Sequence, residues 1–178
     1  NTVRVFGEDI EISDCAFGDL RARVPAIPTL AELIAEFGGQ AHLMIELKEE
    51  EFPQLDKQRE ILRTHLSKLA PTEDYHFLAL DTELFEKFDV QPREACLPVA
   101  LTNMKALSEA ALTNGYGGIT GHFLLLTKAL QAIHKNNGQG IGPGFPRSRK
   151  SLYREVNRCA DWVFTNDAVK LLNVIDEA

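Results

Sequence analysis

The chain has 178 residues, of which 44% are hydrophobic and 25% charged, a balance typical of a globular domain with one sizeable core. This composition excludes disordered, collagen-like and disulfide-rich miniature proteins. Nineteen Lys and Arg against 26 Asp and Glu give a net charge of −7, so nucleic acid is not an expected partner. No run approaches the roughly 18 apolar residues of a membrane span, so none is expected.

The three cysteines, Cys15, Cys96 and Cys159, lie far apart in the chain and show no C-x-x-C spacing. They predict neither a disulfide framework nor a zinc site, and they favour a reducing compartment. We therefore expect the protein in the cytoplasm. A mature periplasmic or secreted protein that had already lost its leader would leave the same sequence.

The first 25 residues combine glycines, Pro25 and short β-branched alternations, which predicts irregular or hairpin structure outside the core. A helix begins after Thr29, because Thr29 and Glu32 have the spacing of a capping box. Gly38 and Gly39 are expected to end this helix.

Apolar runs of strand length alternate with helical patterns over the rest of the chain. The strands are expected at residues 42–47, 75–80, 95–101, 115–120, 140–142 and 161–165. The helices are expected at residues 55–69, 82–88, 103–112, 124–136 and 148–158, followed by a final helix that Asn166 caps. Asn103 is the expected cap of the helix at 103–112.

About six strands that are nearly continuously apolar, each followed by a helix, indicate a parallel sheet covered by helices, and so the α/β class. The chain carries neither G-x-G-x-x-G after a first strand nor G-x-x-x-x-G-K-[ST], the fingerprints of nucleotide-binding sheets. Their absence favours a TIM-type (β/α)8 barrel over an open doubly wound sheet.

Glu46 and Lys48 are two residues apart at the carboxyl end of the strand at 42–47, so their side chains leave the same face. In a barrel this end is the rim of the active site. A carboxylate there can bind a hard cation, and an ammonium group can neutralise a phosphate oxygen. The alternative is an ordinary salt bridge at the end of a strand.

A glycine-rich segment at 142–150 leads into a helix that begins with Arg147, Arg149 and Lys150. Positive charge at a helix N-terminus opposes the helix dipole, and a bound phosphate would explain it. The alternative is a solvated basic face. His122, just past the strand at 115–120, is a further rim candidate, whereas the other four histidines look structural.

Three short segments occur in order along the chain: IPTLAEL at 27–33, MIELK at 44–48 and DWVFTND at 161–167. Together they resemble the glycerophosphodiester phosphodiesterase family, from about Val5 onward. The resemblance implies a (β/α)8 barrel that hydrolyses glycerophosphodiesters to glycerol 3-phosphate and an alcohol. It also implies a divalent metal cofactor, Mg²⁺ or Ca²⁺.

The family's opening motifs, His-Arg-Gly, Pro-Glu-Asn-Thr, Glu-x-Asp and His-Asp, do not occur in this sequence. A full barrel of this type needs about 250 residues. The resemblance therefore implies that residues 1–178 are a single barrel domain that is incomplete at its N-terminus and holds about the last six βα units. Completion by an N-terminal segment or by a second copy in a homo-oligomer is expected.

By the same resemblance, Glu46 is a metal ligand and Lys48 contacts the phosphate. No catalytic residue is assigned, because the family's histidine pair is absent, and the chain alone is expected to be inactive. As substrate contacts we expect His122 at the rim, Phe145 against the alcohol, and Arg147 or Arg149 at the phosphate. One alternative is a non-catalytic barrel remnant that acts as a binding or interaction module, and another is a different barrel phosphodiesterase, such as a phospholipase.

Overall fold

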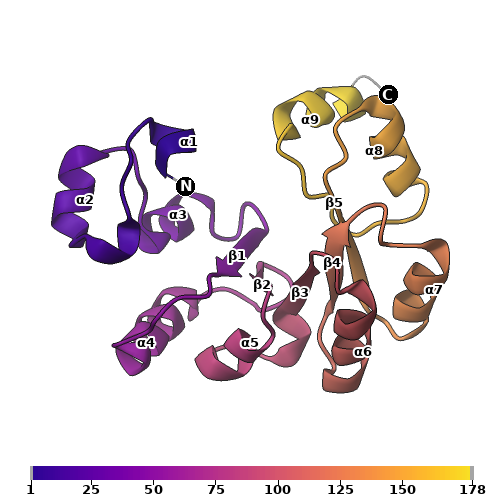
Figure 1. Cartoon of the computed structure of the whole chain (residues 1–178), viewed down its shortest axis with the longest axis horizontal. Coiled ribbons are helices and arrows are strands. Elements are labelled where there is room, and N and C mark those ends of the chain that lie inside the picture. Colours follow the sequence, from indigo (N-terminus) through magenta and orange to yellow (C-terminus); the bar gives the residue numbers. More distant parts are fainter. Residues whose placement is uncertain (1, 177–178) are drawn as a thin grey trace. The chain divides into compact units, whose positions relative to one another are not determined.

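The computed structural model describes residues 2–176, which divide into two compact units within Asn1–Gly38 and Gly39–Ala178 (Figure 1). In the part of the chain described, no helix is long and apolar enough to cross a membrane.

The first unit is helical. It contains α1 (Thr2–Phe6), the 3₁₀ helix η1 (Ile12–Asp14), α2 (Phe17–Arg23) and α3 (Leu30–Phe37). Ile10, Leu20 and Val24 form a small core. The expectation of irregular or hairpin structure outside the core for residues 1–25 is therefore wrong. The hydroxyl of Thr2 donates to the carbonyl of Ile10 and accepts from its N–H, which folds the segment back without a strand pair.

The capping box of α3 is confirmed. Thr29 Oγ1 accepts from the N–H of Glu32 at 3.1 Å, and Glu32 Oε2 accepts from the N–H of Thr29 at 2.8 Å. This backbone hydrogen bond is the main reason that the pKa of the Glu32 carboxyl is lowered, with Arg21 adding to the effect. Gly38 ends the helix by donating to the carbonyl of Ile34.

The described residues of the second unit form one sheet of five parallel strands in the order β1-β2-β3-β4-β5. They are β1 (Leu43–Leu47), β2 (Tyr75–Ala79), β3 (Cys96–Ala100), β4 (Gly118–His122) and β5 (Gly140–Gly144). Consecutive order means that every crossover advances the same way around the sheet, as in a barrel, whereas a doubly wound sheet reverses its order. The expected α/β class is confirmed.

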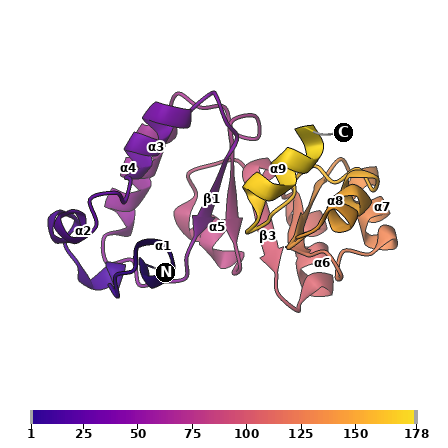
Figure 2. The same cartoon turned by 90° about the horizontal axis from the view of Figure 1, so that it is seen from above.

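A helix follows each strand. These helices are α4 (Leu55–Leu66), α5 (Glu83–Phe88), α6 (Met104–Asn114), α7 (Lys128–Asn136) and α8 (Arg149–Val156), with η2 (Arg93–Ala95) before β3 and α9 (Ala168–Asp176) at the end. Figure 1 shows α4 to α7 along one side of the row of strands, and α9 lies beside α8 in both views (Figure 2). The amphipathic helices thus cover the sheet, as the apolar strands require.

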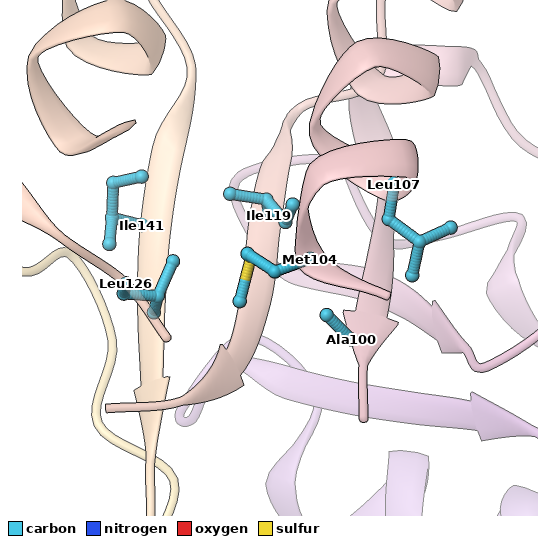
Figure 3. Packing of buried hydrophobic residues seen from close by; sticks show 6 residues of the cluster. All are labelled: Ala100, Met104, Leu107, Ile119, Leu126 and Ile141. Atoms are coloured by element: carbon cyan, nitrogen blue, oxygen red, sulfur yellow. The ribbon is translucent and has the colours of Figure 1, made fainter. Parts of the chain in front are cut away.

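A core cluster lies between α6 and strands β3, β4 and β5 (Figure 3). Ile119 and Ile141 are fully buried on neighbouring strands, and Met104 and Leu107 pack onto the strands from α6. This packing fixes the carboxyl ends of β3, β4 and β5 relative to one another.

The sixth expected strand, at residues 161–165, is wrong. The segment makes a single parallel bridge, Gly144 to Phe164. Asp161 Oδ2 accepts from the N–H of Ile141 at 2.7 Å, so a side chain takes the place that a ladder carbonyl would occupy. Five strands and this bridged segment therefore stand where six βα units were expected.

Glycines in β5 let the bridged segment lie close. A Cβ at Gly140 would be 2.4 Å from the ring of Trp162, and one at Gly142 would be 2.5 Å from the ring of Phe164. The two rings therefore need glycine at both positions.

Several helix boundaries also differ from expectation. α7 begins at Lys128, four residues late, because Thr127 caps it by accepting from the N–H of Leu130. Asn103 is at the N-cap position of α6 but makes no capping hydrogen bond through its side chain. Asn166 is not the cap of α9, since that helix begins at Ala168 and Asp167 precedes it.

Candidate functional site

A cavity of about 360 Å³ opens at the carboxyl ends of the parallel strands. Glu46 of β1, Thr120 and His122 of β4, and Phe145 just after β5 line it together with apolar side chains. The apolar lining comprises Leu78, Val99, Ala100, Leu101 and Phe164. In α/β barrels this end of the sheet carries the active site, so the cavity is the candidate site.

Glu46 and Lys48 form an ion pair at the edge of this cavity, with 2.6 Å between Lys48 Nζ and Glu46 Oε1. The two side chains are 39% and 63% exposed, so the pair contributes at most about 1 kcal/mol to stability. The side chains of Glu46 and Lys48 therefore leave the same face of the chain, as their spacing predicted. The pair is also the strand-end salt bridge that we expected as the alternative. Because this ion pair is weak, a ligand can displace it at low energetic cost.

His122 stacks against two phenyl rings, with centroid distances of 4.5 Å to Phe123 and 5.5 Å to Phe145. Its Nδ1 accepts from the N–H of Leu124 at 3.2 Å, so the neutral imidazole carries its proton on Nε2. Among the described residues none accepts from Nε2. His122 can therefore donate to an oxygen of a ligand in the cavity.

Phe145 is half exposed and has φ +68°, in the left-handed region that a residue with a side chain rarely adopts. Its N–H donates to the carbonyl of Phe164 at 2.7 Å, which holds the turn at the end of β5. The conformation costs on the order of 1–2 kcal/mol, and such strain is concentrated at functional sites. The turn places the phenyl ring at the cavity.

Arg147 and Arg149 do not line the cavity. Arg147 is 75% exposed and pairs with Asp167, with 3.0 Å between Nε and Oδ2. The guanidinium of Arg149 lies over the ring of Tyr153, 5.3 Å from its centroid. The structure thus brings Glu46, Lys48, His122 and Phe145 to one end of the sheet and places the two arginines elsewhere.

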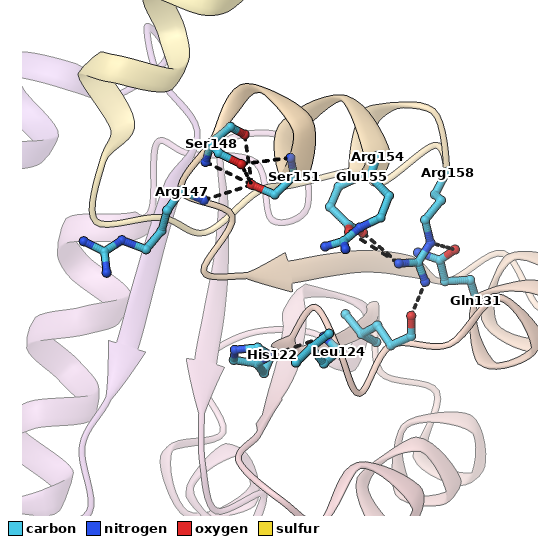
Figure 4. A network of polar contacts seen from close by, with 10 residues as sticks. His122, Leu124, Gln131, Arg147, Ser148, Ser151, Arg154, Glu155 and Arg158 are labelled. Atoms are coloured by element: carbon cyan, nitrogen blue, oxygen red, sulfur yellow. Dashed lines mark hydrogen bonds and ion pairs between the residues drawn. The ribbon is translucent and has the colours of Figure 1, made fainter.

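The start of α8 is already occupied by serine side chains (Figure 4). Ser148 Oγ accepts from the N–H of Ser151, and Ser151 Oγ accepts from the N–H groups of Arg147 and Ser148. Three N–H groups of the expected phosphate seat are therefore taken by capping rather than left for an anion.

The residues present do not fit a divalent cation. Among the described residues, Glu46 is the only carboxylate that lines the cavity, and no group of three or more His, Cys, Asp or Glu side chains could hold a metal ion. Mg²⁺ and Ca²⁺ require about six oxygen ligands, several of them from carboxylates or water.

Two residues of the site were missed from the sequence. Thr120 is buried and donates through Oγ1 to the carbonyl of Pro98 at 3.2 Å. It lies two residues before His122, so strand alternation would have found it. Phe164 was assigned to a strand, and only its position over Gly142 shows that it forms a wall of the cavity.

The expected structural histidines include a hydrogen-bonded pair, of which His76 is buried and His42 is exposed. His42 Nε2 and His76 Nδ1 are 2.8 Å apart, and His42 Nδ1 donates to the carbonyl of Glu73. Burial lowers the pKa of His76 to about 4, and the neighbouring His42 adds to this shift. His134 is fully buried between Ser108 and Gln139, and burial lowers its pKa.

Comparisons with known proteins support the fold. No family model and no curated protein matches the chain. A glycerophosphodiester phosphodiesterase from Thermotoga maritima matches with a TM-score of 0.74 at 18% identity, over 97% of this chain and 75% of that one.

Two further solved structures match the chain with similar TM-scores and coverage. A phosphodiesterase from Oleispira antarctica, in complex with the product sn-glycerol-3-phosphate, matches with a TM-score of 0.75 at 17% identity, over 96% and 74% of the two chains. A putative glycerophosphodiester phosphodiesterase from Galdieria sulphuraria matches with a TM-score of 0.73 at 20% identity, over 94% and 73%. The chain therefore has the α/β barrel fold of the solved glycerophosphodiester phosphodiesterases, over about three quarters of their length.

Proposed function

We propose that this chain forms the phosphodiester-binding part of a glycerophosphodiester phosphodiesterase, which hydrolyses its substrates to glycerol 3-phosphate and an alcohol. One observation carries the proposal: Glu46, His122 and Phe145, from three separate strand ends, line one cavity of a barrel with this fold. The relative from Oleispira antarctica, whose structure holds glycerol 3-phosphate, supports the choice of ligand.

Each side chain has a role in binding. The ammonium group of Lys48 neutralises a phosphate oxygen when Glu46 is engaged elsewhere, and Nε2–H of His122 donates to another oxygen. The ring of Phe145 packs against the carbon skeleton of the alcohol. Arg147 and Arg149 reach the phosphate only if the Asp167 and Tyr153 contacts are exchanged for it.

The divalent metal belongs to the proposal as a requirement of the assembled enzyme. Glu46 is proposed as one ligand of Mg²⁺ or Ca²⁺, and the described residues do not complete the set. We therefore expect the chain alone to bind substrate without turnover. Residues 1–178 are proposed as one incomplete barrel domain, and the edge of β1 that no described strand covers is the place where further βα units or a second copy would pair. The three free cysteines agree with a cytoplasmic location.

Two assays test this proposal. The first measures binding of glycerol 3-phosphate and glycerophosphocholine to the purified chain by isothermal titration calorimetry, for the wild type, Glu46→Gln and His122→Ala. Glu49→Gln is the matched control, since it removes a carboxylate just beyond β1 and outside the cavity. The second measures release of glycerol 3-phosphate with Mg²⁺ or Ca²⁺ present.

We expect His122→Ala to weaken binding on the order of tenfold, the worth of one good hydrogen bond to a charged group. We expect Glu49→Gln to bind like the wild type. Binding that is absent in the wild type, or equal in all variants, would rule the proposal out.

A binding module without hydrolysis is the second candidate. It is favoured by the ion pair of Glu46 with Lys48 and by the lack of a three-ligand metal cluster among the described residues. Glycerophosphodiester binding without release under any metal condition, in a protein that contains every residue of its natural chain, would favour this candidate.

A further inference from the structure

A second and larger hollow, of about 720 Å³, lies between the loop that follows β4 and helix α8. None of its lining residues lines the cavity at the strand ends. The proposed phosphodiester site uses none of them, so an inference drawn here goes beyond that function and does not depend on it.

Positive charge dominates this hollow. Lys128, Arg154 and Arg158 line it, whereas the fully buried carboxylate of Glu155 lies behind them and does not. Glu155 pairs with both arginines, with 2.6 Å from Arg154 Nε to Oε1 and 3.1 Å from Arg158 Nη1 to Oε2. Within the described part of the chain Lys128 makes no ion pair, so three cations face one carboxylate and two positive charges remain.

Arg158 is held in place rather than free to turn away. Its side chain is 13% exposed, and it donates to the carbonyl of Leu126, to Glu155 and to Gln131 Oε1 (Figure 4). The guanidinium of Arg154 lies over the ring of Phe123, 4.3 Å from its centroid. The two arginines are therefore preorganised before any ligand arrives.

Gln131 supplies the independent sign of a ligand. Its side chain lines the hollow and is only 6% exposed. Arg158 Nε donates to its Oε1 at 3.1 Å, which fixes the orientation of the amide because the reversed amide would oppose two donors. Its Nε2 then has no hydrogen-bond partner among the described residues. A buried donor without an acceptor is costly, so an oxygen that reached Nε2 from the hollow would stabilise this region.

We propose that this hollow binds a phosphate group, either inorganic phosphate or the phosphate of a small organic monoester. Two net positive charges match a phosphate dianion, and its several oxygens can meet guanidinium, ammonium and amide donors together. Thr127 begins α7 at the same place, so the positive end of that nine-residue helix also faces the anion. The ring of Phe123 and the exposed Leu124 form an apolar wall that suits an organic substituent.

Calorimetric titration of the whole chain with inorganic phosphate and with phenyl phosphate tests this proposal. The variants are Gln131→Glu and Lys128→Ala. Gln131→Glu keeps the acceptor for Arg158 but replaces the unpaired donor with a carboxylate oxygen. Lys150→Ala is the matched control, because it removes an exposed lysine on α8 outside the hollow. Circular dichroism and urea midpoints establish that each variant is folded.

We expect saturable phosphate binding that Gln131→Glu and Lys128→Ala each weaken on the order of tenfold, and that Lys150→Ala leaves unchanged. Tighter binding of phenyl phosphate than of inorganic phosphate would identify the organic monoester as the ligand, and equal binding would identify free phosphate. No saturable binding, an equal loss in Lys150→Ala, or unchanged binding in Gln131→Glu would overturn the proposal. A loss in His122→Ala alone would overturn it too, because phosphate would then occupy the strand-end cavity.

Discussion

Buried His76, which is hydrogen-bonded to exposed His42, makes the stability of the second unit depend on pH, and the size of this effect can be calculated. His76 is 4% exposed, its ring meets Trp162 edge to face at a centroid distance of 4.9 Å, and its Nδ1 faces His42 Nε2. Because Nδ1 of His42 donates to the carbonyl of Glu73, neutral His42 offers Nε2 as an acceptor, and His76 must donate through Nδ1. Protonation of His76 would add a charge where little water can reach it.

The sign and size follow from the pKa of His76, which falls from 6.5 to about 4 on folding. Above pH 6.5 the group is neutral in both states and contributes nothing to the pH dependence. Below pH 6.5 the unfolded chain binds a proton that the folded chain does not, so stability is lost as the pH falls towards 4. At about 1.4 kcal/mol for each pKa unit, the loss is about 2 kcal/mol at pH 5 and about 3 kcal/mol at pH 4.

The measurement is the free energy of unfolding in urea between pH 7.5 and pH 4, for the wild type and His76→Asn. The Asn side-chain amide replaces Nδ1–H as the donor to His42 but does not titrate, so we expect the variant to lose about 3 kcal/mol less than the wild type over this range. His65→Asn in α4 is the matched control, and it should keep the wild-type slope. Equal slopes for the wild type and His76→Asn would refute the reasoning.

Three other predictions concern stability and reactivity. Glu155→Gln leaves two guanidinium groups without their carboxylate and should lower the free energy of unfolding by about 3 kcal/mol. Asp56→Asn removes a 96% exposed carboxylate that pairs with Arg59 and should change this free energy by less than about 1 kcal/mol; equal urea midpoints would contradict this. A thiol reagent at neutral pH should label exposed Cys159 and leave Cys96, whose pKa burial raises to about 11, unlabelled until urea unfolds the chain; mass spectrometry of the labelled peptides decides. Thr29→Ala should cost α3 about 1 kcal/mol, seen as faster amide exchange in that helix, and unchanged exchange would speak against the capping box.

The strands could be predicted because their signal is local. β2 is buried along its whole length, so Tyr75–Ala79 is a mostly apolar run in which only His76 is ionisable near neutral pH. The capping box of α3 is equally local, since Thr29 and Glu32 are three residues apart. Both patterns predict the structure of a segment from the residues of that segment alone.

The segment at 161–165 could not be predicted in the same way. Its run of Trp162, Val163 and Phe164 has the composition of a strand. The segment makes some backbone hydrogen bonds to β5, but the carboxylate of Asp161 takes the N–H of Ile141, 20 residues away, and Pro143 has no N–H to donate. These contacts join residues that are far apart in the sequence, so the composition of residues 161–165 does not predict them.

In the candidate site, too, local features could be predicted from the sequence, whereas contacts between distant residues could not. Glu46 and Lys48 share a face because strand alternation fixes it, so their proximity could be predicted from two residues of spacing. The stack of His122 on Phe145 joins the ends of two strands, and the barrel order is what brings those ends together. For Arg147 the sequence was misleading, because Ser148 and Ser151, which form the capping box of α8, also take the N–H groups that a phosphate would need.

The phosphate site proposed beside α8 includes a polar group without a hydrogen-bond partner, which sequence analysis alone cannot identify. In the sequence, Gln131 is an ordinary polar residue in the first turn of an amphipathic helix. No residue near it in the sequence indicates that its amide lacks a hydrogen-bond partner. Arg158, 27 residues later, takes the Oε1 and so decides which end of the amide is left over. Glu155 in turn fixes Arg158, and a carboxylate buried between two arginines is stable only when both are present. The unsatisfied donor is thus a product of the packing of α8 onto the start of α7, which brings Arg158 to the amide of Gln131.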